Sequence, residues 1–297
     1  MTISRRFLPG LALPFVATAR AQAPLPVVAS FSILADMARE VGGERASVQA
    51  MVGPDTDAHH FQPRPSQAAA LRAARLAIRN GAGFDSWFDR LIASTRFAGI
   101  QVLATEGLAL RAATGGHGHG GRDPHAWQDV RLAIGYVRNI EAGFRRADPD
   151  GAAHYEARAR AYAERLTALD AWIRAEIATV PEARRIVITS HDAFGYFAAA
   201  YGVRFLAPQG VSMDAEPSAQ QVAGLIRQIR AQGVSALFLE NIGNPATLRR
   251  LAEEAGVRVG GRLFADALSA PEGPAATYEA MMRHNVGLMV PAMRGAG

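Results

Sequence analysis

The chain has 297 residues, of which 49% are hydrophobic and 20% are charged, and its 32 basic and 27 acidic residues give a formal net charge of +5. This composition excludes a disordered chain and allows one large or two medium domains with apolar cores. The sequence contains no cysteine and no lysine. It therefore excludes disulfide frameworks, thiolate metal sites, cysteine nucleophiles and lysine Schiff bases, so any metal must be bound by histidine and carboxylate.

Residues 1–23 are predicted to be a secretory signal peptide. They begin with Arg5 and Arg6, continue with an apolar stretch over 7–19 and end on Ala21-Gln22-Ala23. The apolar stretch is too short for a spanning helix of about 20 residues, so no membrane insertion is expected. Without a cysteine to acylate, the mature chain is expected to be free in the periplasm. Cleavage would leave only a small net charge, and the arginines lie among Glu and Ala without an aromatic stripe, so no nucleic-acid binding is expected.

After the signal peptide, short β-rich runs alternate with helical patterns. In the first half, strands are predicted at 27–30, 47–52, 76–79 and 101–104, with helices at 32–41, 66–74 and 129–144. In the second half, strands are predicted at 185–189, 203–206 and 236–239, with helices at 194–201, 218–232, 245–255 and 277–285. The alternation predicts an α/β protein of two similar lobes, each with a parallel sheet flanked by helices.

A long helix is predicted between the two halves. Asp148 and Pro149 supply an N-cap and a first-turn proline, and neither Pro nor Gly interrupts residues 152–180. Apolar residues keep helical spacing along one face: Tyr155, Ala159, Tyr162, Leu166, Leu169, Ile173 and Ile177. We expect a rigid backbone helix of about 30 residues, roughly 45 Å long. The predicted organisation is a signal peptide over 1–23, an N-terminal lobe over 24–147, the linking helix over 148–180 and a C-terminal lobe over 181–297.

Four candidate metal ligands lie near the predicted ends of strands. His59 is in the loop after the strand that ends at residue 52, and His191 directly follows the strand at 185–189. His125 opens the approach to a helix, and Asp266 ends the run 263–266. Ligands of open α/β sheets gather at the carboxyl ends of strands. Three imidazoles and one carboxylate suit Zn²⁺, and each lobe would contribute two of them to a site in the cleft between the lobes.

The residues around these candidates resemble the metal-specific solute-binding proteins of ABC transporters, the cluster A-I or ZnuA/TroA-like family. The stretch Asp57-Ala58-His59-His60-Phe61-Gln62-Pro63 is similar to the family's DPHxYxP motif, and Asp123-Pro124-His125-Ala126-Trp127-Gln128-Asp129 matches DPHxWxD. Ser190-His191-Asp192-Ala193-Phe194-Gly195-Tyr196 matches SHxAFxY, and Phe264-Ala265-Asp266 resembles the final FxD. The resemblance covers essentially the whole mature chain and implies His59, His125, His191 and Asp266 as the metal ligands.

The ligand types bear on the choice of metal. Manganese-binding members of the family place a carboxylate at the position of His191, and Mn²⁺ favours oxygen whereas imidazole suits Zn²⁺. His191 therefore favours one tight Zn²⁺ site, with Mn²⁺ as the alternative. One departure from the family is Ala58, where relatives have Pro or, in some zinc-uptake members, a carboxylate. No ligand is expected from that position, which makes Asp266 more important.

Three further residues are candidates for supporting roles. The Gly/His tract over 115–121 contains His117 and His119, and a His-rich loop precedes the Asp-Pro-His motif in zinc-uptake relatives. These two histidines are candidates for transient zinc capture, the alternative being a plain connector. Glu240, at the end of a predicted strand, is a candidate partner that fixes the tautomer of an imidazole. Its alternative is a helix-capping or surface carboxylate.

Other residues of the motifs are expected to be structural. Asp57 and Asp123 are interpreted as turn-forming loop residues rather than ligands. His60 is expected to point away from the metal. Trp127 and Phe61 are expected to screen the site from water.

The resemblance implies a periplasmic zinc receptor that delivers Zn²⁺ to the membrane permease of an ABC importer, as a monomer and without catalysis. A manganese or broader divalent-metal receptor of the same family is the first alternative, followed by a periplasmic zinc chaperone or an adhesin. A secreted zinc hydrolase is the remote alternative. Against it, the sequence contains neither HExxH nor Gly-x-Ser-x-Gly, and four protein ligands leave no open position for a substrate.

Overall fold

A computed structural model describes residues 23–113, 121–208, 210, 218–234 and 236–295. The signal peptide predicted over 1–23 therefore lies outside the described residues except for Ala23, and so do His117 and His119. The N-terminal lobe contains β1 Leu25–Phe31, α1 Ser32–Gly42, β2 Ala46–Val52, α2 Pro65–Ala73, β3 Leu76–Arg79, α3 Ser86–Thr95, β4 Ile100–Leu103 and α4 Val130–Ala147. After α5 Ala152–Ala178, the C-terminal lobe contains β5 Ile186–Ile188, α6 Gly195–Tyr201, β6 Arg204–Leu206, α7 Ala219–Gln232, β7 Ala236–Glu240, α8 Ala246–Ala255, β8 Arg258–Leu263 and α9 Tyr278–Arg294.

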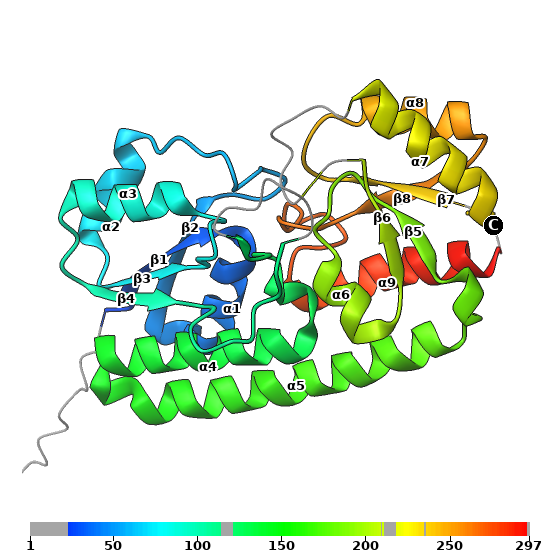
Figure 1. Cartoon of the computed structure of the whole chain (residues 1–297). Helices are drawn as coiled ribbons and strands as arrows, with labels where there is room; N and C mark the ends of the chain where they lie inside the picture. Colours follow the sequence, from blue (N-terminus) through cyan, green and yellow to red (C-terminus); the bar gives the residue numbers. More distant parts are fainter. Residues whose placement is uncertain (1–22, 114–120, 209, 211–217, 235, 296–297) are drawn as a thin grey trace, which may run out of the picture.

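Each lobe is built on one four-stranded parallel sheet, and the two sheets have the same arrangement. The strand order is β2-β1-β3-β4 in the first sheet and β6-β5-β7-β8 in the second. In the first lobe α1 and α4 cover one face of the sheet and α2 and α3 the other, while α7 and α8 lie opposite α9 in the second lobe (Figure 1). This confirms the predicted pair of α/β lobes. Loops that follow the strands of both sheets meet between the lobes (Figure 1).

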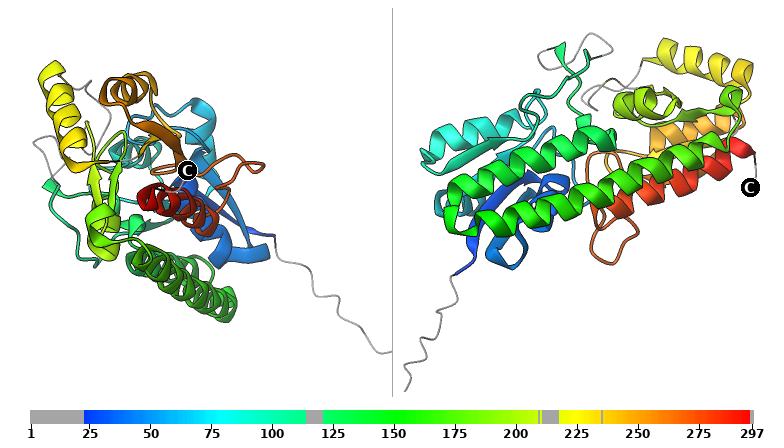
Figure 2. Two further views of the ribbon diagram at one scale, coloured as in Figure 1. Left: turned by 90° about the vertical axis from the view of Figure 1, so that its right-hand side faces the viewer. Right: turned by 90° about the horizontal axis from the view of Figure 1, so that it is seen from below.

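The linking helix α5 runs along both lobes, as its sequence predicts (Figures 1 and 2). It has 27 residues, which corresponds to about 40 Å. It contacts α1 and α4 on one side of the molecule and α6 and α9 on the other. The predicted start is one turn too early, because Pro149–Gly151 forms a 3-10 turn and Asp148 does not cap the helix. Instead the Asp148 carboxylate accepts hydrogen bonds from Arg45 at 2.8 Å and from the Tyr155 hydroxyl at 2.7 Å.

The predicted apolar stripe of α5 is buried along its whole length. The buried residues of the helix are Tyr155, Ala159, Tyr162, Leu166, Leu169, Ile173 and Ile177. They belong to a hydrophobic core that continues from the sheet of the first lobe to α9 of the second. A smaller core lies under α7 and α8. Because both lobes share the larger core, moving them apart as rigid bodies would expose apolar surface, which is costly.

Two elements are absent from the predicted series, and one is longer than predicted. The helix α3 is short. Glycines at positions 260 and 261 and arginines at positions 258 and 262 hide the strand character of β8. The last helix continues to Arg294 rather than stopping at Asn285, and it contains Pro291. Burial of Met289, Val290 and Met293 offsets the helical hydrogen bond that Pro291 removes.

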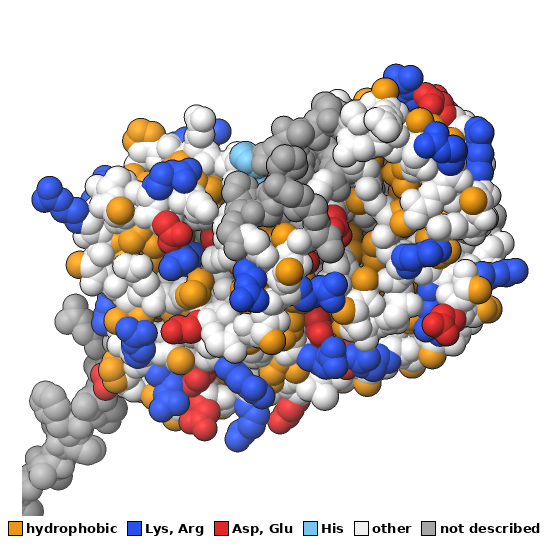
Figure 3. Space-filling model, in the orientation of Figure 1, with side chains coloured by type: hydrophobic (Ala, Val, Ile, Leu, Met, Phe, Trp, Pro, Cys, Tyr) orange, Lys and Arg blue, Asp and Glu red, His pale blue; other side chains and the backbone are white. Residues whose placement is uncertain are grey.

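The outer surface combines charges of both signs. On the face shown in Figure 3, arginine side chains alternate with acidic ones rather than gathering into one patch. Among the helices of the described residues, none has both the length and the apolarity that a membrane crossing requires.

A buried carboxyl joins the first lobe to the last helix. Asp36 of α1 accepts a hydrogen bond at 2.8 Å from the backbone N–H of Tyr278, the first residue of α9. Burial raises the pKa of Asp36 to about 6, with nearby Glu40 and Glu279 adding to the shift, while the Tyr278 hydrogen bond and Arg39 oppose it. The folded chain therefore binds a proton that the unfolded chain releases near pH 4. Stability is then lost as the pH rises from about 4 to about 6.

We expect the substitution Asp36→Asn to stabilise the protein at pH 7.5 and to have little effect at pH 4. The amide keeps an oxygen to accept from Tyr278 but carries no charge to desolvate. The gain at pH 7.5 should be about 1–3 kcal/mol in the free energy of unfolding. Urea unfolding of the metal-free protein at both pH values measures it. An equal change at both pH values would contradict the assignment.

Candidate metal centre

Four side chains from both lobes meet at one point between the sheets. His59 lies in the loop between β2 and α2, and His125 precedes α4 in the first lobe. His191 follows β5, and Asp266 follows β8 in the second lobe. Each residue offers one donor atom, and the four atoms all lie within 4.8 Å of one another. The structure thus brings together the four residues that were predicted from the sequence to be ligands.

The spacing of the donor atoms suits a small tetrahedral ion. The Nε2 atoms of His125 and His59 are 3.3 Å apart, and Asp266 Oδ2 lies 3.0 Å from His191 Nε2. Asp266 also lies 3.4 Å from His59 Nε2, and its other oxygen is 3.5 Å from His125 Nε2. Donors bound tetrahedrally at about 2.0–2.1 Å from a zinc ion lie about 3.3 Å apart. These four separations of 3.0–3.5 Å are close to that value, so the centre is suited to an ion of this size.

Two of the three imidazoles are held by a carboxylate on the side away from this point. Asp123 Oδ1 lies 2.8 Å from His125 Nδ1 and also accepts from the His125 backbone N–H at 3.0 Å. Glu240 Oε2 lies 2.6 Å from His191 Nδ1, and Glu240 Oε1 accepts from the backbone N–H groups of Ser190 and His191. A carboxylate at Nδ1 favours the tautomer with its proton there and leaves Nε2 free to bind a metal.

His59 is positioned differently from the other two histidines. Its side chain is only 2% exposed, yet its Nδ1 has no hydrogen-bond partner among the residues that the structure describes. The loop holds it through the backbone: Asp57 Oδ1 accepts from the His59 N–H at 2.8 Å. The carbonyl of the buried Ala58 accepts from Trp87 Nε1 at 2.8 Å. Position 58 therefore anchors the loop.

Carboxylates around the site control the charge of the imidazoles. Burial opposes the charged form of His191, but Glu240 and Asp266 outweigh it and raise the pKa of His191 well above its ordinary value. Burial also opposes the charged form of His125, but Asp266 and Asp123 outweigh it and raise the pKa of His125 to about 9. For His59 burial prevails and lowers the pKa. Despite its burial, Asp266 has its pKa held well below the usual value by His125 and His191. The centre favours positive charge.

A network at the end of β3 fixes the loop that carries His125. Asn80 Nδ2 donates to the carbonyl of Pro124 at 3.0 Å, and Tyr136 donates its hydroxyl to Asn80 Oδ1 at 2.7 Å. The carboxylate of Asp85 accepts from the backbone N–H of Asn80 at 2.7 Å. All these groups are buried, so the Asp-Pro-His turn has little freedom to move.

Contacts between the lobes fix Asp266. The carbonyl of Ala265 accepts from Trp127 Nε1 at 2.9 Å and from Gln128 Nε2 at 2.8 Å. The Tyr278 hydroxyl donates to the Trp127 carbonyl at 2.6 Å. Residues next to the first-lobe ligand His125 therefore hold the residue next to the second-lobe ligand Asp266.

Aromatic rings enclose the first-lobe side of the centre. Trp127 is fully buried, with its ring centroid 5.3 Å from that of His125, as its predicted screening role requires. Phe84 packs against His59 at 4.4 Å between centroids. Phe61 packs on Trp87 at 5.0 Å instead of on a candidate ligand, so its predicted role passes to Phe84.

Several supporting residues differ from their predicted roles. Asp123 and Asp57 form the expected turn contacts, but Asp123 also contacts an imidazole ring, which its position two residues before His125 could have indicated. Asn80 carries no motif signal, because its role depends on the packing of β3 against α4. His60 is half-exposed and lies 3.9 Å from Asp57, away from the four donors.

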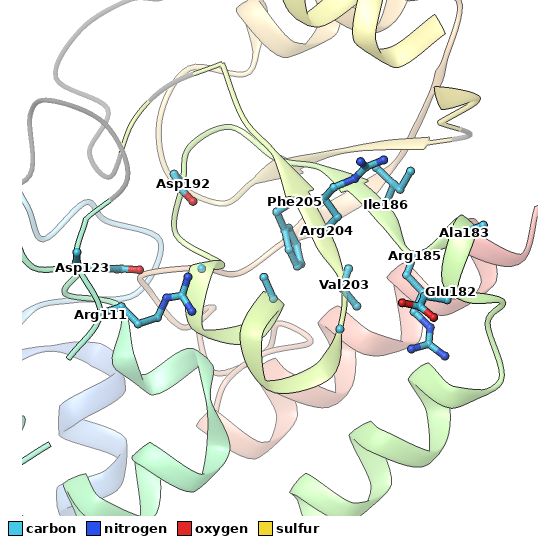
Figure 4. Close-up of a pocket in the computed structure, with 14 residues that line it drawn as sticks. Arg111, Asp123, Glu182, Ala183, Arg185, Ile186, Asp192, Val203, Arg204 and Phe205 are labelled. Atoms are coloured by element: carbon cyan, nitrogen blue, oxygen red, sulfur yellow. The ribbon is translucent and has the colours of Figure 1, made fainter. Parts of the chain in front are cut away.

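A cavity of about 960 Å³ lies beside the centre and is lined by residues of both lobes, most of them from the C-terminal lobe (Figure 4). Asp123 lines one end of it, close to Arg111 and Gly195, whereas none of the four candidate ligands lines it. A Cβ atom at position 195 would lie 2.8 Å from Asp123 Oδ2. The glycine in this motif therefore leaves room for the carboxylate that holds His125.

Comparison with known proteins relates the whole chain to one family of metal transport components. A family model described as "ZnuA: Zinc-uptake complex component A periplasmic" matches residues 27–292. The manganese-binding lipoprotein MntA of Halalkalibacterium halodurans is 32% identical over 268 residues, which are 90% of this chain and 87% of that protein. The iron-binding protein YfeA of Yersinia pestis is 30% identical over 260 residues, covering 88% and 83% of the two chains.

The fold has the same relatives. The solved structure of the periplasmic zinc-binding protein TroA from Treponema pallidum matches with a TM-score of 0.85 at 27% identity. The match covers 92% of this chain and 99% of that one. The named relatives therefore share the architecture but differ in the metal that their names state.

We expect Asp123→Asn and Glu240→Gln each to lower metal affinity by about 10–100-fold. Each amide keeps an acceptor oxygen but loses the charge that orients an imidazole. Competition with a zinc chelator measures the affinity, and Glu253→Gln, on the exposed side of α8, is the matched control. Wild-type affinity in both site variants would show that neither carboxylate positions a ligand.

Proposed function

Because the chain belongs to the family of periplasmic component A proteins of zinc-uptake complexes, we propose that it captures Zn²⁺ and delivers it to the permease of an ABC importer. Members of this family are the metal-binding, substrate-binding components of ABC transporters, so the chain is an extracytoplasmic transport component and not an enzyme. The metal is its cargo. In this proposal His59, His125, His191 and Asp266 bind the ion.

The spacing of the four donors is the observation that carries the proposal. Four separations of 3.0–3.5 Å, one between two imidazole nitrogens and three between a nitrogen and an Asp266 oxygen, are close to the value of about 3.3 Å expected in a tetrahedral zinc shell. Three buried carboxylates, Asp266, Asp123 and Glu240, surround three imidazoles that are neutral when they bind metal. In the metal-free centre the raised pKa values of His125 and His191 keep these rings protonated, so an entering divalent ion takes the place of their protons beside the carboxylates.

Zinc is the cargo that the ligand set favours, and manganese is the alternative. Three imidazole nitrogens suit Zn²⁺, whereas Mn²⁺ favours a larger share of oxygen ligands. The relatives' names support a divalent transition metal without choosing one, since they state manganese, iron and zinc. The Irving–Williams order makes such a site prefer Zn²⁺ over Mn²⁺ in solution, so affinity must be read together with the metal content of protein from cells.

Delivery requires the bound ion to leave a site that both lobes complete. Because α5 and the shared core join the lobes, release is proposed to involve local shifts of the ligand loops rather than wide opening. The loaded monomer would dock on the permease in the periplasm after signal-peptide cleavage. The chain contains no cysteine that could carry a lipid, unlike relatives named as lipoproteins.

We expect metal-free protein to bind one equivalent of Zn²⁺ tightly, and His191→Ala to weaken binding by at least about 100-fold. The substitution removes one of four ligands and leaves Glu240 Oε2 without the imidazole that it contacts. Calorimetric titration with chelator competition measures both values, and His284→Ala is the control, since His284 lies outside the centre on α9.

The same pair of variants tests delivery. In a zinc-starved strain lacking the chromosomal gene, the His284→Ala protein should restore uptake and the His191→Ala protein should not. Tight zinc binding without any rescue of uptake would favour a periplasmic chaperone or an adhesin instead.

We expect His191→Asp to raise the ratio of Mn²⁺ affinity to Zn²⁺ affinity by about tenfold or more. The change gives two imidazoles and two carboxylates, the more oxygen-rich set that Mn²⁺ favours. Parallel titrations of the variant and the wild type with both metals give the ratio. An unchanged ratio would show that the residue at 191 does not set the choice of metal.

A further inference from the structure

Hydrogen bonds between the two lobes join the loop of His59 to the C-terminal lobe. Asp55 lies in the loop between β2 and α2, on the same loop as His59. Its backbone N–H donates to the Leu268 carbonyl at 2.9 Å. Its Oδ1 accepts from Asn241 Nδ2 at 3.0 Å, and its Oδ2 accepts from the Ala270 N–H at 3.3 Å. All three partners belong to the C-terminal lobe.

Asn241 connects this contact to the second-lobe ligands. Its Nδ2 also donates to the Ala267 carbonyl at 3.2 Å, so one amide bridges Asp55 and the segment just after Asp266. Asn241 itself directly follows Glu240, the carboxylate that holds His191. Asp55 and Asn241 therefore join the loop of His59 to the two segments that carry the second-lobe half of the centre.

The backbone of Asp55 is held in an uncommon conformation. Its φ is +50°, in the left-handed region that favours glycine and that Asn and Asp enter more readily than other residues. This conformation aims both the N–H and the carboxylate of Asp55 at the second lobe. The strain in the turn is maintained by the contacts across the lobes.

His59 depends on its loop more than the other two histidines do. The rings of His125 and His191 are each fixed by a carboxylate, whereas no side chain or backbone group in the described part of the chain bonds to His59 Nδ1. Within the first lobe the loop of His59 is tied by the hydrogen bond from Trp87 to the Ala58 carbonyl. Toward the second lobe it is tied through Asp55.

The side-chain contact of Asp55 is more exposed than the contacts between the lobes that hold Asp266 and Trp127. The bonds from Trp127 to Ala265 and from Tyr278 to Trp127 are buried, whereas the bond between Asp55 and Asn241 is exposed. An exposed hydrogen bond exchanges with water at little net cost, so it opens far more often than a buried one. The bond between Asp55 and Asn241 can therefore open while the shared core stays closed.

We propose that Asp55 and Asn241 form an interlobe clasp that positions His59 against the second-lobe ligands and sets the rate of metal release. This inference rests on the proposed metal-binding function. When the clasp is closed, the His59 loop is held to the loops of Glu240 and Asp266 and the shell is complete. When it opens, His59 moves away with its loop and leaves the ion on His125, His191 and Asp266, from which it dissociates faster.

The test measures how fast Zn²⁺ leaves the full-length protein. Zinc-loaded protein is mixed in a stopped-flow instrument with a fluorescent chelator in large excess, at concentrations where the rate no longer depends on the chelator. Asp55→Gly removes the carboxylate but tolerates the left-handed backbone and keeps the N–H donor. Asn241→Ala removes the other half of the clasp. Thr56→Ala is the matched control, because within the described ranges the Thr56 hydroxyl bonds to Pro54 of its own loop and not to the second lobe.

We expect Asp55→Gly and Asn241→Ala each to raise the release rate by about tenfold, while Thr56→Ala stays within twofold of wild type. The double variant should release zinc no more than about twofold faster than the faster of the two single variants, because either single substitution already breaks the bond between Asp55 and Asn241. Asp55→Asn, which keeps one acceptor oxygen and tolerates the turn, should restore most of the wild-type rate. The urea midpoint of the metal-free protein should stay unchanged in all variants.

Wild-type release rates in both single variants would overturn the proposal, as would single effects that multiply in the double variant. A urea midpoint lowered in proportion to the faster release would also overturn it, because that result indicates general destabilisation. These outcomes all require a wild-type protein that binds zinc tightly. Failure of the wild type to bind zinc would instead contradict the proposed function.

Discussion

Four donor atoms from two lobes must stay about 3.3 Å apart, and much of the structure serves this constraint. The helix α5 and a core shared by both lobes fix the distance between the two sheets. The hydrogen bonds from Trp127 and Gln128 to the Ala265 carbonyl then place Asp266 against the loop of His125. Alignment at the scale of ångströms thus follows from packing over the full length of the molecule.

The three histidines are not held equally firmly. In the proposed release, the least constrained of them, His59, leaves the ion first. His125 and His191 are fixed at Nδ1 by carboxylates that are themselves buried. The ring of His59 has no such partner, and its loop reaches the second lobe through the exposed Asp55. A receptor must bind its cargo tightly and still release it, and one weakly held ligand reconciles these demands without separating the lobes.

Sequence was sufficient for the features that rest on local pattern. The alternation of strands and helices predicted both lobes, and the helical spacing from Tyr155 to Ile177 predicted the buried stripe of α5. The loop motifs, three after strands and one before a helix, included all four side chains that meet. Asn80 and Asp55 could not be found in this way, because their roles arise from residues distant in sequence, such as Tyr136 and Asn241. Glu240 was identified because it ends a predicted strand, and it holds the imidazole of His191.

X-ray absorption spectroscopy of the zinc-loaded protein tests the central claim, that these four residues form one closed metal shell, most directly. The account predicts four light-atom ligands at about 2.0 Å, with the multiple-scattering signature of three imidazoles and one oxygen, and the loss of one imidazole contribution in His191→Ala. A shell containing fewer imidazoles in the wild type, or one left unchanged by the substitution, would contradict the account.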